Sequence, residues 1–220
     1  MPPADRIYDP GQGAKKDLTD TGDDFLAIGP ALQIMQLNVE GLSATKCEVI
    51  SCIAERQKID AIVICLEETR VDVDKTNRFS IAVFDLLAYS LHAKYGQATY
   101  VRDNIFDAHH VTSSVCYDIV RIGSYHVANI YKPPSENWGT TNTLPVVPHP
   151  SLMVGDFSSH HPDWGYQEPD EDGKMLQDWA SGNDYHLVHD SKQRGTFHSA
   201  RWKRDYSPDL YNESCSLFHP

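Results

Sequence analysis

At 220 residues, with 40% of them hydrophobic, the chain is long enough to bury one sizeable core and shows no extreme compositional bias. Its longest apolar run, from Ala61 to Leu66, is far shorter than the roughly 20 residues that a membrane-spanning helix requires, so we expect no membrane partner. The formal net charge of −12 is unusual for a nucleic-acid enzyme, because a basic domain is the usual electrostatic footprint of such proteins.

Residues 1–30 are rich in Pro, Gly and Asp and have little periodicity, which predicts a flexible leader before a single domain at residues 31–220. The leader lacks a basic start followed by an apolar stretch, so it does not resemble a secretory signal. The cysteines form no CxxC pair, and most lie within apolar patterns (Cys47, Cys52, Cys65 and Cys116). We therefore expect reduced core cysteines in an intracellular protein, not disulfides or a zinc site.

The first predicted elements are a strand from Leu32 to Val39 and a helix that runs to about Gln57, with Ser43 or Thr45 as its N-cap. The short apolar run at residues 61–66 suits a strand that is buried on both faces.

The middle of the chain is rich in predicted strands, and a buried strand, a helix and a short strand follow them. In chain order these segments are Leu86–Leu91, Gln97–Val101, Val111–Arg121, Tyr125–Tyr131, Leu152–Phe157, Gly173–Ser181 and Tyr185–Val188. Because helices and strands do not alternate strictly, the sequence predicts an α/β fold of two packed mixed β-sheets flanked by helices, a four-layer α/β sandwich, not a Rossmann sheet.

Polar side chains follow four of the apolar, strand-like runs. They are Asn38 in QLNVEGL, Glu68 in CLEET, Tyr131 in NIY and Asp156 in VGDF. If these strands end at one edge, an amide, two carboxylates and a phenol converge there. An oxygen-rich set of this kind suits Mg²⁺ and a phosphate better than zinc, copper or an acyl group, and points to metal-dependent phosphodiester hydrolysis.

The order of the motifs NVEGL, LEET, NIYKPP and GDFSSHHPDWG, followed by GTFHS and SPDL, resembles the endonuclease/exonuclease/phosphatase superfamily. Within it, the chain is similar to the apurinic-type endonuclease domain of non-LTR retrotransposons, over roughly Leu32 to Leu210. The resemblance implies an endonuclease domain of retroelement origin that hydrolyses DNA phosphodiester bonds with Mg²⁺ or Mn²⁺.

The resemblance also implies roles for individual residues. Glu68 would be the principal metal ligand, and Asn38 would hydrogen-bond the scissile phosphate or a metal-bound water. Tyr131 would lie near the phosphate, although a strand tyrosine by itself is more often a core residue. Asp156 would handle a proton, either of the attacking water or of the leaving oxygen. Glu67 stands where the family usually has Gln, and we expect it to support the metal site from behind or to face outward.

Two further positions match the later motifs. Thr196 would assist phosphate binding, and Asp209 would orient a catalytic histidine. His160 and His161 are adjacent and are better explained as histidines of a surface turn than as metal ligands, because neighbouring side chains project in different directions and the family uses oxygen ligands.

The chain departs from the family pattern in two places. Ser158 replaces the Asn of the usual GDFN motif, and the loss of one transition-state hydrogen bond costs on the order of 10²–10³ in rate. The family also closes its domain with a strand that carries a Ser-Asp-His-like segment, whereas His219 follows Asp209 too closely to complete that strand. We therefore expect a domain that lacks its C-terminal strand and nicks DNA weakly or not at all.

One dense basic run with no interleaved acid is the predicted DNA-binding surface, with Trp202 available for base stacking; it comprises Lys192, Arg194, Arg201, Lys203 and Arg204. For the basic run, the alternative is a solvated loop. For the protein, two alternatives stay open: a catalytically inactive nucleic-acid-binding remnant and a phosphatase of the same fold. We expect an intracellular location, with the nucleus as one candidate compartment.

Overall fold

The computed structural model describes residues 32–56, 63–71, 80–92, 94–188, 195, 197–199, 204–206 and 208–214. The predicted leader and the chain after Ser214 lie outside the described residues, so the expectations of a leader and of a missing last strand stay predictions. No helix of the described part is long and apolar enough to cross a membrane.

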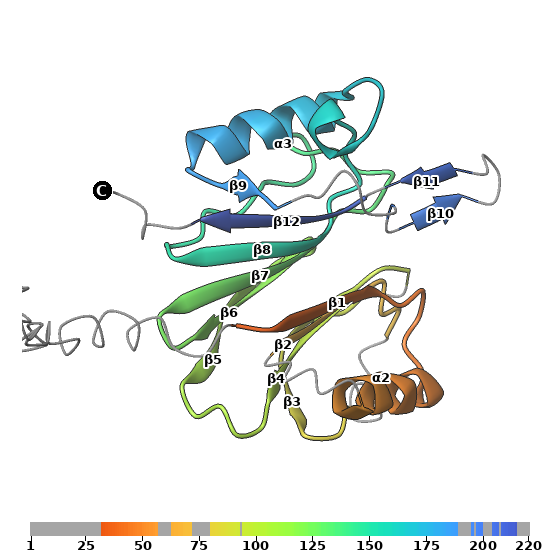
Figure 1. The fold of residues 1–220 in the computed structure, drawn as a ribbon, viewed down its shortest axis with the longest axis vertical. Coiled ribbons are helices and arrows are strands. Elements are labelled where there is room, and N and C mark those ends of the chain that lie inside the picture. Colours follow the sequence, from red (N-terminus) through yellow and green to blue (C-terminus); the bar gives the residue numbers. More distant parts are fainter. Residues whose placement is uncertain are drawn as a thin grey trace, which may run out of the picture. The chain divides into compact units, whose positions relative to one another are not determined.

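The first sheet has four strands in the order β1 (Ile34–Asn38), β2 (Val63–Glu67), β4 (Gln97–Arg102) and β3 (Phe84–Ser90). Strands β1 and β2 are parallel, and the other neighbours are antiparallel. Helix α2 (Ala44–Arg56) begins where Ser43 Oγ accepts from Lys46 N at 3.2 Å, and its apolar side chains pack against this sheet (Figure 1).

The second sheet has six strands, in the order β5 (Ala108–Ser113), β6 (Tyr117–Ile122), β7 (Tyr125–Tyr131), β8 (Ser151–Asp156), β12 (Asp209–Ser214) and β9 (His186–Leu187). Strands β7 and β8 are parallel. Helix α3 (Glu171–Gly182) and the short helix η2 (Pro162–Trp164) pack on its outer face (Figure 1). Strands β10 (Phe197–Ser199) and β11 (Arg204–Tyr206) form a separate antiparallel pair.

Between the two sheets lies an aliphatic core to which β2, β6, β7 and β8 contribute, for example through Val63, Val120, Val127 and Val154. With a helix outside each sheet, this arrangement confirms the predicted four-layer α/β sandwich. Two details of the sequence prediction were wrong. Residues 111–121 span two strands, because the chain turns where Ser114 N donates to Tyr117 O at 2.7 Å. Cys52 is exposed, whereas Cys47, Cys65 and Cys116 are buried, and all four are free thiols.

Gly155 allows β7 and β8 to approach each other just before the site. Its φ is +135°, and a Cβ atom at this position would lie 1.9 Å from Ile130 O. No other residue fits this place without moving the neighbouring backbone. The glycine therefore permits this close pairing, in which Tyr131 lies opposite Asp156.

A buried polar group crosses the aliphatic core near the same end of the sheets. Asn129 Nδ2 of β7 donates to Leu66 O at 3.3 Å, to Ala98 O at 3.3 Å and to Thr99 Oγ1 at 3.2 Å. Next to Asn129 in the ladder, Asp118 is fully buried, and neither of its carboxyl oxygens makes a hydrogen bond with the described residues. Burial raises the pKa of Asp118 to about 7, and the nearby Ser113 and Gln97 side chains offset only part of that effect.

We predict that Asp118→Asn makes the stability of the protein less dependent on pH. The pKa of Asp118 rises from 3.8 in the unfolded chain to about 7 in the folded protein, so its contribution to stability is lost as the pH rises through this window. From pH 4.5 to pH 8, the free energy of unfolding measured in urea should fall by roughly 3 kcal/mol less in the variant than in the wild type. The exposed aspartate variant Asp85→Asn is the control, and equal falls in all three proteins would contradict the assignment.

Candidate active site

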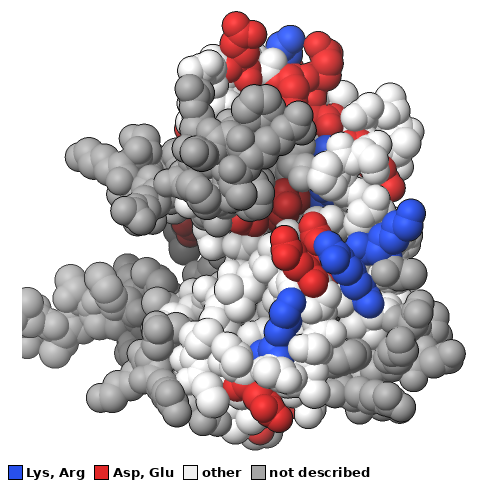
Figure 2. All heavy atoms as spheres, turned by 90° about the vertical axis from the view of Figure 1, so that its right-hand side faces the viewer, with Lys and Arg blue, Asp and Glu red and all other residues white. Residues whose placement is uncertain are grey.

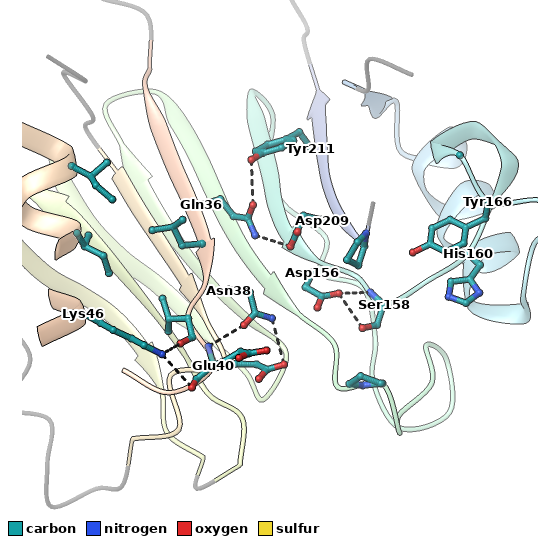
Figure 3. A pocket seen from close by; sticks show the side chains of 18 of the residues that line it. Gln36, Asn38, Glu40, Lys46, Asp156, Ser158, His160, Tyr166, Asp209 and Tyr211 are labelled. Atoms are coloured by element: carbon teal, nitrogen blue, oxygen red, sulfur yellow. Dashed lines mark hydrogen bonds between the residues drawn. The ribbon is translucent and has the colours of Figure 1, made fainter. Parts of the chain in front are cut away.

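The polar side chains predicted to converge do so at one edge of the two sheets. Asn38 Nδ2 lies 3.4 Å from Glu68 Oε1, and Tyr131 OH donates to the same oxygen at 3.1 Å. Asp156 follows on β8, which pairs with β7. Three of these residues, Asn38, Glu68 and Asp156, line one large groove with a volume of about 1530 Å³ (Figure 3). Its other walls come from α2, from residues near His160 and from the start of β12.

The turn after β1 presents an acidic residue that the sequence analysis did not single out. Glu40 lines the groove, has a positive φ of 43° and donates its backbone N–H to Asn38 Oδ1 at 3.2 Å. Lys46 Nζ of α2 holds the turn by donating to Val39 O, and to Gly41 O at 2.9 Å. An acid followed by Gly directly after a predicted strand was the available signal for Glu40.

The segment after β2 is held in an unusual backbone conformation. Glu68 and Arg70 both have positive φ values, 50° and 51°, which are uncommon for residues other than Gly. Hydrogen bonds fix the segment from both sides, with Gly41 N donating to Glu68 O at 2.7 Å and Arg70 N donating to Tyr95 O at 2.6 Å. The strained backbone aims the Glu68 carboxylate at the groove, where Arg70 Nη2 contacts Glu68 Oε2 at 2.6 Å.

Glu67, the last residue of β2, points into the protein and not outward, which corrects one of the two orientations expected for it. Its side chain is fully buried, and Gln36 Nε2 donates to its Oε2 at 3.0 Å. No hydrogen bond from the described residues reaches its Oε1. Burial, followed by the charges of Asp209 and Asp156, raises the pKa of Glu67 well above its ordinary value, although the Gln36 hydrogen bond opposes this.

Asp156 is held by Ser158, which stands where the resemblance implies an asparagine. Ser158 donates to Asp156 Oδ1 from its backbone N at 2.8 Å and from its Oγ at 3.0 Å. Burial and the charge of Asp209 raise the pKa of Asp156 to about 6, while the two Ser158 hydrogen bonds act in the opposite direction. The φ of Ser158 is 42°, a left-handed conformation that Asn adopts more readily than Ser.

Asp209 lies at the start of β12, directly opposite Asp156 in the antiparallel ladder. Its Oδ1 accepts a hydrogen bond from Gln36 Nε2 at 2.9 Å, and Tyr211 OH donates to Gln36 Oε1 at 3.2 Å (Figure 3). Among the described residues, Gln36 is therefore the side chain that donates to Asp209. On the other side of the site, burial and the neighbouring Glu68 raise the pKa of Tyr131, so this phenol stays protonated.

The two histidines of the loop after β8 differ in their surroundings. His160 lines the groove, stacks on Tyr166 at 4.2 Å between ring centroids and lies 3.5 Å from Asp170 Oδ2. His161 is the N-cap of η2, with its Nδ1 accepting from Asp163 N at 3.2 Å. Several predicted site residues lie outside the described residues (Thr196, Lys192, Arg194, Arg201 and Lys203), and of Arg204 only the backbone is described, in β11.

The chemistry of the groove fits a divalent cation of the magnesium type. All candidate ligands are oxygens, the buried Glu67 Oε1 has no donor among the described residues, and the pKa values of Glu67 and Asp156 are raised in part by neighbouring carboxylates. A cation would relieve that repulsion. The described residues do not form a finished cluster of three acidic, histidine or cysteine ligands. Mg²⁺ commonly binds through one or two carboxylates and keeps several waters.

Comparison with known proteins agrees with this fold. Residues 125–216 match the family described as endonuclease-reverse transcriptase. The fold is similar to the endonuclease domain of TRAS1, a telomere-specific non-LTR retrotransposon, with 13% identity, a TM-score of 0.61 and coverage of 83% of this chain and 85% of that chain. The resemblance to the endonuclease/exonuclease/phosphatase superfamily is confirmed.

Other solved structures share the fold of this chain. The AP endonuclease LMAP from Leishmania major has 14% identity and a TM-score of 0.63, with 84% of this chain and 80% of that chain covered. The 3' phosphatase NExo from Neisseria, bound to a product DNA hairpin, has 13% identity and a TM-score of 0.59, with coverage of 85% and 88%. No curated protein sequence matches the chain.

We predict that Glu67→Gln stabilises the metal-free protein at alkaline pH. The amide keeps an acceptor for Gln36 but removes a buried charge beside Asp156 and Asp209, and such replacements stabilise by roughly 1–3 kcal/mol. Because burial and the neighbouring carboxylates raise the folded-state pKa of Glu67, the benefit should grow as the pH rises and shrink as the pH falls towards the ordinary pKa of a glutamate.

Chemical denaturation in EDTA at pH 5 and pH 8 measures this difference in free energy of unfolding, with Glu213→Gln on the exposed side of β12 as the control. A variant that is less stable than the wild type at pH 8 would show that the Glu67 charge is compensated by a partner.

Proposed function

We propose that the protein hydrolyses phosphodiester bonds in DNA with the help of Mg²⁺ or Mn²⁺, as a nuclease of retroelement origin. The observation that carries the proposal is the convergence of carboxylates at one groove: Glu40, Glu68, Asp156 and Asp209 line it, and Asn38 lies beside them. The similar NExo structure supports DNA as the substrate, because it is described as bound to a product DNA hairpin.

Each groove residue has a role that follows from its surroundings. Glu68, together with Asn38 or Glu40, would hold the metal, which when bound supplies positive charge to the phosphate oxygens. Asp156, whose pKa is raised to about 6, is suited to accept or return a proton near neutral pH. Ser158 keeps that carboxylate in place, and Tyr131 keeps Glu68 in place.

Two observations favour weak activity. Ser158 offers a single hydroxyl, and this hydroxyl already donates to Asp156, so it has no second donor for a phosphate. Asp209, which the resemblance expects to orient a catalytic histidine, instead accepts a hydrogen bond from Gln36. The same observations keep a catalytically inactive nucleic-acid-binding remnant as the second candidate, and the 3' phosphatase among the similar structures keeps phosphomonoester hydrolysis as the third.

We predict slow nicking of supercoiled plasmid DNA in Mg²⁺ or Mn²⁺, reduced by roughly 10²-fold or more in Asp156→Asn. Exposed Asp178 on α3 provides the matched control, Asp178→Asn, which should nick like the wild type. Wild-type protein that nicks no faster than Asp156→Asn, with either metal, would support the inactive remnant.

Restoring the family residue is expected to increase the rate. Asn fits the left-handed backbone at position 158 and adds an amide with both a donor and an acceptor, so Ser158→Asn should raise the nicking rate at least roughly tenfold. Ser158→Ala, which removes the hydroxyl bond to Asp156, should lower it. A rate that is equal in Ser158→Asn and Ser158→Ala would show that this position does not limit the reaction.

We also propose that the basic run at residues 192–204, which lies mostly outside the described residues, provides most of the affinity for DNA. Neutralising several phosphates releases counterions, so log K should fall steeply with log salt. The triple variant Arg201→Ala, Lys203→Ala and Arg204→Ala should lower that slope by roughly two to three. A slope unchanged by the triple substitution, measured by fluorescence anisotropy with a DNA duplex, would leave the run as a solvated loop.

A further inference from the structure

Arg70 makes an ion pair with the carboxylate to which the proposed function assigns the metal. The distance from Arg70 Nη2 to Glu68 Oε2 is 2.6 Å, and the two side chains are 47% and 17% exposed. The other oxygen, Glu68 Oε1, is already contacted by Tyr131 OH at 3.1 Å and by Asn38 Nδ2 at 3.4 Å. A cation that binds Glu68 must therefore compete with a donor on either oxygen, and on Oε2 that donor carries a full positive charge.

Lys46, a lysine near this turn, is not available to neutralise Glu68. Lys46 Nζ donates to the backbone oxygens of Val39, Glu40 and Gly41, so its charge is used to hold the β1–α2 turn. The guanidinium of Arg70 has a single carboxylate contact among the described residues and is half exposed. On the face drawn in Figure 2, acidic and basic side chains lie directly beside one another near the middle.

The backbone under Arg70 is fixed while its side chain is exposed. Residues 68–70 are held between Gly41 and Leu42 on one side and Tyr95 and Gly96 on the other by four backbone hydrogen bonds of 2.6–3.0 Å. A side chain on such a support can change partner without moving the main chain. Guanidinium groups bind carboxylates and phosphates with the same planar fork, so a phosphate oxygen is a suitable second partner.

We propose that Arg70 is an exchangeable cation of the site: it neutralises Glu68 before a divalent metal binds and contacts a phosphate of the DNA substrate afterwards. The proposal rests on the proposed function, because it takes Glu68 as the metal ligand. It makes metal and DNA binding mutually favourable, since the metal releases Arg70 for the phosphate and the phosphate removes Arg70 from Glu68. The coupling is reciprocal by thermodynamic linkage.

The first test is calorimetric titration of the metal-depleted full chain with Mn²⁺ alone. Arg70→Gln removes the competing charge, so Mn²⁺ should bind roughly two- to tenfold more tightly than to the wild type. Arg121→Gln is the matched control, because Arg121 of β6 forms a comparable pair at 3.0 Å with Asp107, which directly precedes the edge strand β5. Glu68→Gln should abolish the binding.

The second test measures binding of a short labelled DNA duplex with and without Ca²⁺, a divalent cation that also prefers oxygen ligands. The cation should tighten DNA binding to the wild type and to Arg121→Gln. In Arg70→Gln this coupling should be clearly smaller, because only the direct attraction between the cation and the phosphate remains. Unchanged Mn²⁺ affinity in Arg70→Gln, with loss in Glu68→Gln, would overturn the exchange and leave the metal site intact. Equal Mn²⁺ binding by wild type and Glu68→Gln would instead overturn the metal site and the exchange together. Mn²⁺ binding by Arg70→Gln but not by the wild type would support the exchange even if the wild type nicks no DNA.

Discussion

Repulsion among the carboxylates at the ends of β2, β8 and β12 is the interaction on which the site depends. Glu67 is fully buried, Asp156 is nearly so, and both lie close enough to Asp209 for its charge to raise their pKa values. Such an arrangement costs stability in the absence of a cation, and a protein that only needed to fold could replace these acids by amides. The donors that do reach the acids, from Gln36, Ser158 and Arg70, compensate for part of the charge.

The fold creates this crowding through a few local constraints. Gly155 lets β8 lie against β7, so that Asp156 stands beside Tyr131, and the antiparallel β12 then places Asp209 opposite Asp156. In the other sheet, the left-handed backbone at Glu68 and Arg70 brings a carboxylate and a guanidinium to the same groove edge. Stability is therefore lost at the strand ends and supplied by the aliphatic core and the two helices behind them.

The layers of this fold, and the meeting of four polar residues, were predictable from the sequence because buried strands are continuous apolar runs and end in polar residues. The β5–β6 turn was missed because residues 111–117 contain no Gly, Pro, Asn or Asp to mark a turn, so the segment reads as one strand. The inward orientation of Glu67 was not predictable, since it depends on Gln36 and Asp209, which are distant in sequence. The pairing of Arg70 with Glu68 depends on two positive φ values that no residue pattern signals.

The central claim is that these carboxylates form a site for a divalent cation, and thermal unfolding at pH 8 as a function of Mg²⁺ concentration tests it most directly. Binding to the folded state alone should raise the Tm of the wild type by about 5 °C or more when Mg²⁺ exceeds its Kd a hundredfold. Glu68→Gln should show little rise over the same range. A Tm that does not change with Mg²⁺, or that rises equally in both proteins, would contradict the account.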